Sequence, residues 1–120
     1  EKLYTDKSPV AFIKNFPEFT SPFWNMKRNT ENDTGKKVDV ILSGMETFGS
    51  AERECDVNIM RNRFENIMDG NYRKKLIQLF GEERVESELK EYFELSFIPR
   101  VGTGIGITRL IKSMEKEGLL

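Results

Sequence analysis

The 120-residue chain contains no histidine and a single cysteine, Cys55. The lack of histidine excludes a histidine-based catalytic triad, a histidine zinc site and a histidine proton shuttle. One cysteine excludes a disulfide within the chain, which suits a reducing compartment, and we expect a cytoplasmic protein. With no histidine beside it, Cys55 is expected to be structural rather than catalytic. No apolar run reaches membrane-spanning length and the first residues lack the shape of a signal peptide, so no membrane partner is expected.

The charge balance excludes a second group of functions. The formal net charge is −1, so nothing global points to nucleic acid or to an anionic membrane surface. With 38% hydrophobic and 32% charged residues, the composition is that of an ordinary folded chain, long enough for one small domain or part of a larger one. The chain does not begin with methionine, and we expect a fragment or a processed product.

The order of apolar patterns predicts an α+β fold with an antiparallel sheet and flanking helices. Short β-branched or alternating runs predict strands, and steps of three and four residues predict helices. Strands are expected over residues 10–13, 23–28 and 38–42, with 45–48 continuing the third or forming a fourth, and an exposed hairpin loop is expected over 29–37. Helices are expected over 56–70, 72–80 and 83–97, followed by a glycine-rich strand from Val101 and a last helix that ends at Gly118.

Two acids and an arginine follow one another at seven-residue steps around the third strand. They are Asp39, Glu46 and Arg53, with Gly44 and Gly49 between them. Two carboxylates meet the usual count for Mg²⁺ held together with a nucleotide, because water completes the shell. The pattern alone leaves open three solvated charges at loop edges. Asp39 fits that alternative least well, since it lies inside a β-branched run.

Three alternating glycines precede the last helix at positions 102, 104 and 106. Glycine lets another group approach the backbone, and a helix N-terminus favours anions. Arg109 lies in the first helical turn and outside the apolar stripe of Ile107, Leu110, Ile111 and Met114, which we expect to face the core. A cation at this place suits a triphosphate. The alternative is a strand packed tightly against a helix, with a surface arginine.

Two further patterns favour structural interpretations. The aromatic residues Phe16, Phe19, Phe23 and Trp24 can form a stacking platform, but core and loop packing is favoured. The charged run from Glu82 to Glu91 is typical of a solvated helix face.

Taken together, three stretches resemble the catalytic domain of class II aminoacyl-tRNA synthetases of the aspartyl/asparaginyl branch. Residues 8–17 with 21–27 are similar to the branch's "P-V-F-I-x-x-Y-P … P-F-Y-M-K" strand pair. Residues 38–53 are similar to its "D-x-x-x-x-G-x-E-x-x-G-(G)-S-x-R" segment, and residues 102–111 to motif 3, "G-x-G-x-G-x-x-R". The resemblance covers nearly the whole chain, 1–120, as the C-terminal half of that domain.

The resemblance implies a role for each matching residue. Asp39 and Glu46 match the acids that hold Mg²⁺ and ATP. Arg53 matches the arginine that receives the side-chain end of the amino acid, with Gly49 and Ser50 in the turn beside it. Gly104, Gly106 and Arg109 match the ATP-binding residues of motif 3, with Arg109 as the catalytic residue facing the γ-phosphate. The implied reaction activates aspartate or asparagine as an aminoacyl adenylate for transfer to tRNA, with asparagine slightly favoured.

The sequence also departs from the family pattern. Thr108 stands where Asp or Glu is usual, and motifs 1 and 2 and an anticodon-binding domain are absent. The resemblance therefore implies a chain that is inactive alone and a homodimeric full-length protein. Two alternatives stay open: an asparagine synthetase-like paralogue that does not bind tRNA, and a non-catalytic binding module that has kept the fold.

Overall fold

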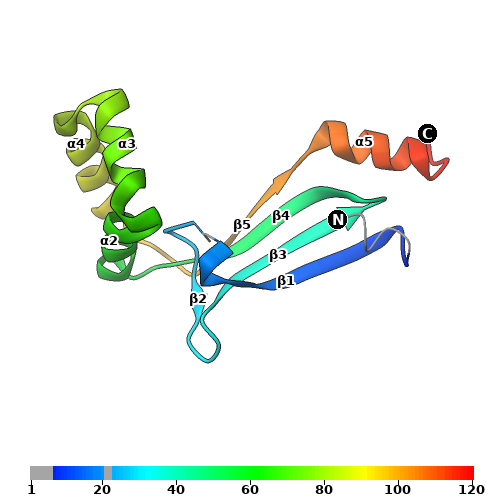
Figure 1. The fold of residues 1–120 in the computed structure, drawn as a ribbon, viewed down its shortest axis with the longest axis horizontal. Coiled ribbons are helices and arrows are strands. Elements are labelled where there is room, and N and C mark those ends of the chain that lie inside the picture. The colour runs from blue at the N-terminus through cyan, green and yellow to red at the C-terminus, as the bar shows by residue number, and fades with distance from the viewer. Residues whose placement is uncertain (1–6, 21–22) are drawn as a thin grey trace.

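The computed structural model describes residues 7–20 and 23–120. It confirms the α+β fold: an antiparallel sheet with helices at both of its ends, arranged as an elongated molecule of 51 × 34 × 27 Å (Figure 1). The first six residues, which we expected to be a polar lead-in, and Pro22, which precedes the expected second strand, lie outside the described residues. None of the helices in the described part of the chain is both long and apolar enough to cross a bilayer.

The sheet has the strand order β1-β3-β4-β5, and the short strand β2 also pairs with β3. All of these pairings are antiparallel. The strands are β1 (Val10–Pro17), β2 (Arg28–Asn29), β3 (Thr34–Leu42), β4 (Met45–Arg53) and β5 (Arg100–Ile105). β3 and β4 join through Ser43 and Gly44, both with positive φ, as a tight type I′ hairpin turn requires.

Several expected strand limits were wrong. The expected second strand over 23–28 is reduced to β2 and one isolated bridge between Met26 and Arg53, because this segment turns to cover the helices. The expected loop over 29–37 is shorter, since β3 already begins at Thr34. β1 continues to Pro17 through a bulge at Asn15, whose φ of 61° takes it out of the ladder.

Three helices form a separate layer at one end of the sheet (Figure 1). They are α2 (Val57–Asn66), α3 (Asn71–Phe80) and α4 (Glu82–Phe93), with the 3₁₀ segment η2 (Ile67–Gly70) between the first two. The Asp56 carboxylate caps α2 by accepting hydrogen bonds from the amides of Asn58 (2.8 Å) and Ile59 (3.1 Å). α2 ends before Gly70 because Met68 and Asp69 have positive φ. α4 ends at Phe93, before the extended segment leading to Pro99.

The hydrophobic core lies mainly in these helices rather than under the sheet. Trp24 packs there with Met60, Phe64, Val85 and Phe93, all buried. Its ring contacts Phe64 edge to face at a centroid distance of 5.5 Å. We call α2, η2, α3 and α4 with Trp24 the helical module. Of the expected aromatic set, Trp24 is therefore core, whereas Phe19 is exposed, so the four do not form one platform. The charged residues from Glu82 to Glu91 are exposed, as expected.

The last helix, α5 (Ile107–Lys116), lies at the opposite end of the sheet from the helical module (Figure 1). The expected core stripe on α5 was wrong, since Ile107 and Ile111 are exposed. The buried residue is Ser113, whose hydroxyl donates to the Leu42 carbonyl oxygen at 3.1 Å. α5 thus docks on the β3–β4 turn by polar contacts. At the other end of the chain, β1 is followed by a short 3₁₀ segment, η1 (Glu18–Thr20).

Candidate functional site

The predicted site residues converge on one face of the sheet because of strand register. Asp39 on β3 pairs with Gly49 on β4, which pairs with Gly104 on β5. Two residues nearer to the helical module, Ala51 pairs with Lys37 on one side and with Gly102 on the other. Two residues farther along β4, Arg53 pairs with Arg100. Side chains two residues apart on a strand share a face. We call the face that carries Asp39, Gly49 and Arg53 the site face.

The two acids meet above Gly49. A Cβ atom on Gly49 would lie 3.3 Å from Oε1 of Glu46 and 3.5 Å from Oδ1 of Asp39, so both oxygens border one small space. Asp39 is only 5% exposed, which makes the solvated-charge alternative wrong for this residue. Its Oδ2 pairs with Nζ of Lys37 at 2.6 Å, whereas its buried Oδ1 accepts no hydrogen bond from any described residue. A buried carboxylate oxygen without a donor fits a cation ligand.

Asp39 and Glu46 together can bind at most one cation, through two carboxylate groups. No cluster of three or more acidic, cysteine or histidine residues suited to a metal occurs among residues 7–20 and 23–120. Mg²⁺ tolerates one or two protein carboxylates because water and phosphate oxygens supply the rest of its shell. Asp39 and Glu46 therefore fit Mg²⁺ that arrives with a nucleotide, and they do not form a closed all-protein metal cage.

Arg53 lies flat across β5. A Cβ atom on Gly102 would come within 2.9 Å of its Nε and 3.1 Å of its Nη2, so the absence of a side chain at position 102 makes room for the guanidinium. Nη1 of Arg53 donates to Oδ1 of Asn25 at 3.2 Å. Arg53 forms no ion pair with a carboxylate of the described residues. Most of its five donors thus remain available for an incoming anion or amide.

A cavity of about 360 Å³ opens beside Arg53. Phe23, Asn25, Arg53, Arg100, Val101 and Gly102 line it. Arg100 stands opposite Arg53 in the strand register and stacks on Phe97, with its Cζ 4.8 Å from the ring centroid. Two guanidinium groups at one cavity make it suited to a small ligand with a carboxylate or a carboxamide end.

The motif 3 glycines leave a second open area. Nothing in the described part of the chain lies within 4 Å of a Cβ built on Gly104, whereas one on Gly106 would meet Cδ of Arg109 at 3.4 Å. Arg109 is exposed, as predicted, and its Nη1 donates to the main-chain carbonyl oxygen of Glu46 at 2.8 Å. This bond ties the α5 arginine to β4, the strand that carries Glu46.

Ser50 does not join this group. It lies within β4, so the expected turn at Gly49 and Ser50 was wrong. Alternation along the strand turns Ser50 away from the site face, and its hydroxyl donates to the Val38 carbonyl oxygen at 2.9 Å. An amino-acid-binding role for Ser50 stays a prediction.

The prediction from sequence did not include two residues that lie next to the site, Lys37 and Asn25. Lys37 has a signal that could have identified it, because its spacing of two from Asp39 on a strand implies a shared face. Asn25 has no such signal, since it contacts Arg53 across 28 residues of sequence.

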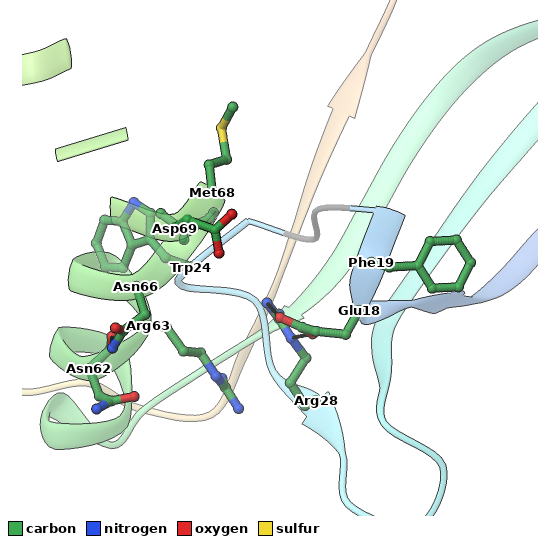
Figure 2. Close-up of a pocket in the computed structure, with 10 residues that line it drawn as sticks. Glu18, Phe19, Trp24, Arg28, Asn62, Arg63, Asn66, Met68 and Asp69 are labelled. Atoms are coloured by element: carbon green, nitrogen blue, oxygen red, sulfur yellow. Dashed lines mark hydrogen bonds and ion pairs between the residues drawn. The ribbon is translucent and has the colours of Figure 1, made fainter. Parts of the chain in front are cut away.

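A further cavity of about 470 Å³ lies between η1 and α2 (Figure 2). Arg28, Glu18, Asn62, Arg63 and Asp69 are among the residues that line it, and Arg28 is paired with Glu18. None of the predicted site residues borders this space. The site face and this cavity are therefore separate features.

Family membership follows from a match to one known protein family. The model of the family "tRNA synthetases class II (D, K and N)" matches residues 2–118. The chain belongs to this family. Within it, the chain is 29% identical over 109 residues to the asparagine–tRNA ligase of Mycoplasma genitalium, which covers 90% of this chain and 21% of that protein. The chain thus spans about a fifth of the length of this curated synthetase.

Solved synthetase structures share the fold. An asparaginyl-tRNA synthetase from Entamoeba histolytica in complex with asparaginyl-adenylate matches with a TM-score of 0.71 and 15% identity, over 97% of this chain and 24% of that one. A putative aspartyl-tRNA synthetase from Leishmania major Friedlin matches with a TM-score of 0.66 and 20% identity, over 98% and 21% of the two chains. The resemblance to class II aminoacyl-tRNA synthetases is confirmed, at the level of the family that comprises the aspartate, lysine and asparagine enzymes.

Proposed function

We propose that residues 1–120 are the C-terminal half of a synthetase catalytic domain that activates asparagine or aspartate with ATP. The observation that carries the proposal is the meeting of Asp39 Oδ1 and Glu46 Oε1 over Gly49, on the face where Arg53 lies across Gly102. The site face therefore carries a potential cation site beside a potential site for a small polar ligand. The proposed reaction joins the amino acid's carboxylate to the α-phosphate of ATP and releases pyrophosphate.

Arg53 is proposed to receive the side-chain end of the amino acid. Its free donors and the neighbouring cavity of about 360 Å³ support this role. Asn25 holds the guanidinium from one side, and the bare backbone of Gly102 supports it from below. Asparagine is slightly favoured over aspartate, because the similar proteins include the asparagine–tRNA ligase of M. genitalium and the E. histolytica enzyme solved with asparaginyl-adenylate.

ATP is proposed to lie over Gly104 and Gly106, where the backbone is open to close approach. Arg109 is the proposed catalytic residue and faces the γ-phosphate, where a fixed guanidinium stabilises charge on the leaving pyrophosphate. Asp39 and Glu46 would hold Mg²⁺. When bound, this ion neutralises phosphate charge so that a carboxylate can approach the α-phosphate.

The remaining roles belong to the full-length protein. We propose that it is a cytoplasmic homodimer, that tRNA is the acceptor, and that motifs 1 and 2 come from outside this chain. Because motif 2 is absent from this chain, the 120 residues alone are expected to give no ATP–pyrophosphate exchange. Exchange by the isolated chain would contradict this division of the site.

The test measures ATP–pyrophosphate exchange by the full-length parent, with asparagine and aspartate supplied separately. Arg53→Ala is expected to raise the KM for the amino acid and Asp39→Ala to lower kcat, each by at least about tenfold, since each removes a charged contact to a reacting group. Lys112→Ala on the exposed part of α5 is the matched control and should match the unmodified protein. Unchanged activity in both site variants would refute the proposal.

A further inference from the structure

We infer that Lys37 is a positioning residue that turns Asp39 toward the metal, an inference that rests on the proposed function. Lys37 and Asp39 share the site face of β3, two residues apart. Nζ of Lys37 lies 2.6 Å from Oδ2 of Asp39. The contact occupies one carboxylate oxygen and leaves the other, Oδ1, beside Glu46 without a donor among the described residues.

Lys37 is itself held in place. Its ammonium group lies 4.1 Å from the centroid of the Phe16 ring, so the ring and the Asp39 carboxylate share one cation. Phe16 reaches this position because β1 bulges at Asn15 and pairs again at Gly35. The side chains of Lys37 and Asp39 are 27% and 7% exposed, so water competes little for the carboxylate. A lysine fixed on two sides can hold the Asp39 carboxylate in a single orientation.

The consequence for a bound cation follows from the two carboxylate oxygens. A metal ligand usually has an outer partner that fixes its direction, and loss of such a partner typically costs about 10–100-fold in metal affinity. Lys37 is that partner for Asp39. Simple charge repulsion predicts the opposite sign, because removal of a positive charge near a cation strengthens its binding. The direction of change therefore separates positioning from mere proximity.

The experiment titrates Mg²⁺ into the full-length parent in the presence of a non-hydrolysable ATP analogue and measures the affinity by isothermal titration calorimetry. Mn²⁺ in place of Mg²⁺ then reports by electron paramagnetic resonance whether the ion is bound to the protein. Lys37→Met is expected to weaken Mg²⁺ binding about 10–100-fold, because the apolar chain still packs on Phe16 but no longer holds Oδ2. Lys37→Arg should restore most of the affinity. Lys37→Gln should behave as Lys37→Met does, and it serves as the second neutral variant if methionine perturbs the fold.

The control is Lys36→Met, which removes the same charge from the opposite face of β3, where Lys36 pairs with Glu52. It should bind Mg²⁺ as the unmodified chain does. Lys37→Met binding that equals or exceeds the unmodified affinity, or an equal loss in Lys36→Met, would overturn the role of Lys37. Asp39→Asn and Glu46→Gln test the proposed function separately. If neither weakens binding, or if the unmodified parent binds no Mg²⁺ in the presence of the ATP analogue, the metal assignment itself fails.

Discussion

The helical module and the sheet differ in what their residues are used for. The module buries Met60, Phe64, Val85 and Phe93 around Trp24. The sheet instead carries acids, arginines and glycines on its site face, and its opposite face leaves Phe12 and Ile105 at least half exposed. Apolar burial is the main source of folding free energy. Stability is therefore concentrated in the helices, whereas the sheet carries the binding groups.

One carboxylate connects the two regions. Glu54, buried between β4 and α2, accepts hydrogen bonds through Oε1 from the amides of Cys55 (2.9 Å) and Asp56 (3.3 Å). Its Oε2 pairs with Arg63 of α2 at 3.1 Å, and Arg63 also donates to the Met26 carbonyl oxygen at 3.1 Å. Because Arg53 directly precedes Glu54, the module can hold the end of β4 and with it the amino-acid cavity. The helices thus support the site without lining the acid pair.

Of the changes that test this difference between the helical module and the sheet, Trp24→Ala is expected to have the largest effect. Removal of a large buried aromatic side chain typically costs about 3–5 kcal/mol, and we expect this loss in the free energy of unfolding. Urea denaturation followed by circular dichroism measures it. Phe19→Ala is the control, because Phe19 is 87% exposed and its removal should change stability by no more than about 0.5 kcal/mol. Equal effects of the two variants would contradict a core centred on Trp24.

Local sequence signals predicted the parts of the fold that depend on short-range chemistry. The β-branched strand that ends at Leu42, the helix that follows Asp56 and the strand-to-helix change after Ile105 need only nearby residues. Residues 23–28 were assigned to a strand because their alternation was judged alone. Trp24 is in fact drawn into the helical module, and long-range packing overrides local preference.

The same division applies to the site. Asp39, Glu46, Arg53 and Arg109 were candidates from their positions in the sequence together with the family resemblance. Strand register brings the first three to one face, and Arg109 is bonded to the main chain of Glu46. The α5 stripe failed as a core prediction because periodicity marks an apolar face but not what covers it. In this chain α5 turns Ser113 to the sheet instead. Asn25 was missed because a contact across distant segments leaves no periodic signal.

A paired glycine substitution separates support of the amino acid from support of ATP. In Gly102→Ala, the new Cβ would lie 2.9 Å from Nε of Arg53, and the flexible arginine must move. We expect the KM for the amino acid to rise about 10–100-fold in the full-length parent, with little change in stability. Gly104→Ala meets no described atom within 4 Å, so it should fold normally and raise the KM for ATP instead. If each variant raised the KM for both substrates equally, the proposed division of the site face into an amino-acid part and an ATP part would be wrong.

The smallest expected effect comes from a surface charge group on the sheet. Glu52 pairs with Nζ of Lys27 at 2.7 Å and of Lys36 at 3.2 Å. Its hydrogen bond to Lys27, followed by that to Lys36, lowers the pKa of the Glu52 carboxyl group, and the same contact with Glu52 raises the pKa of Lys27. These side chains are well exposed, so salt screens the interaction and its contribution falls far below that of Trp24.

The sign of its pH dependence follows from these directions. A carboxyl group whose pKa is lower in the folded state stabilises the fold above its unfolded pKa of about 4.3, and this stability is lost as the pH falls through the folded pKa. The Lys27 contribution is instead lost only as the pH rises above its raised pKa. Glu52→Gln should therefore reduce the free energy of unfolding at pH 7, and the difference should shrink at low pH and in high salt. Urea titrations at both pH values measure it, and a loss that is independent of pH would show that Glu52 acts through packing, as the helical module does.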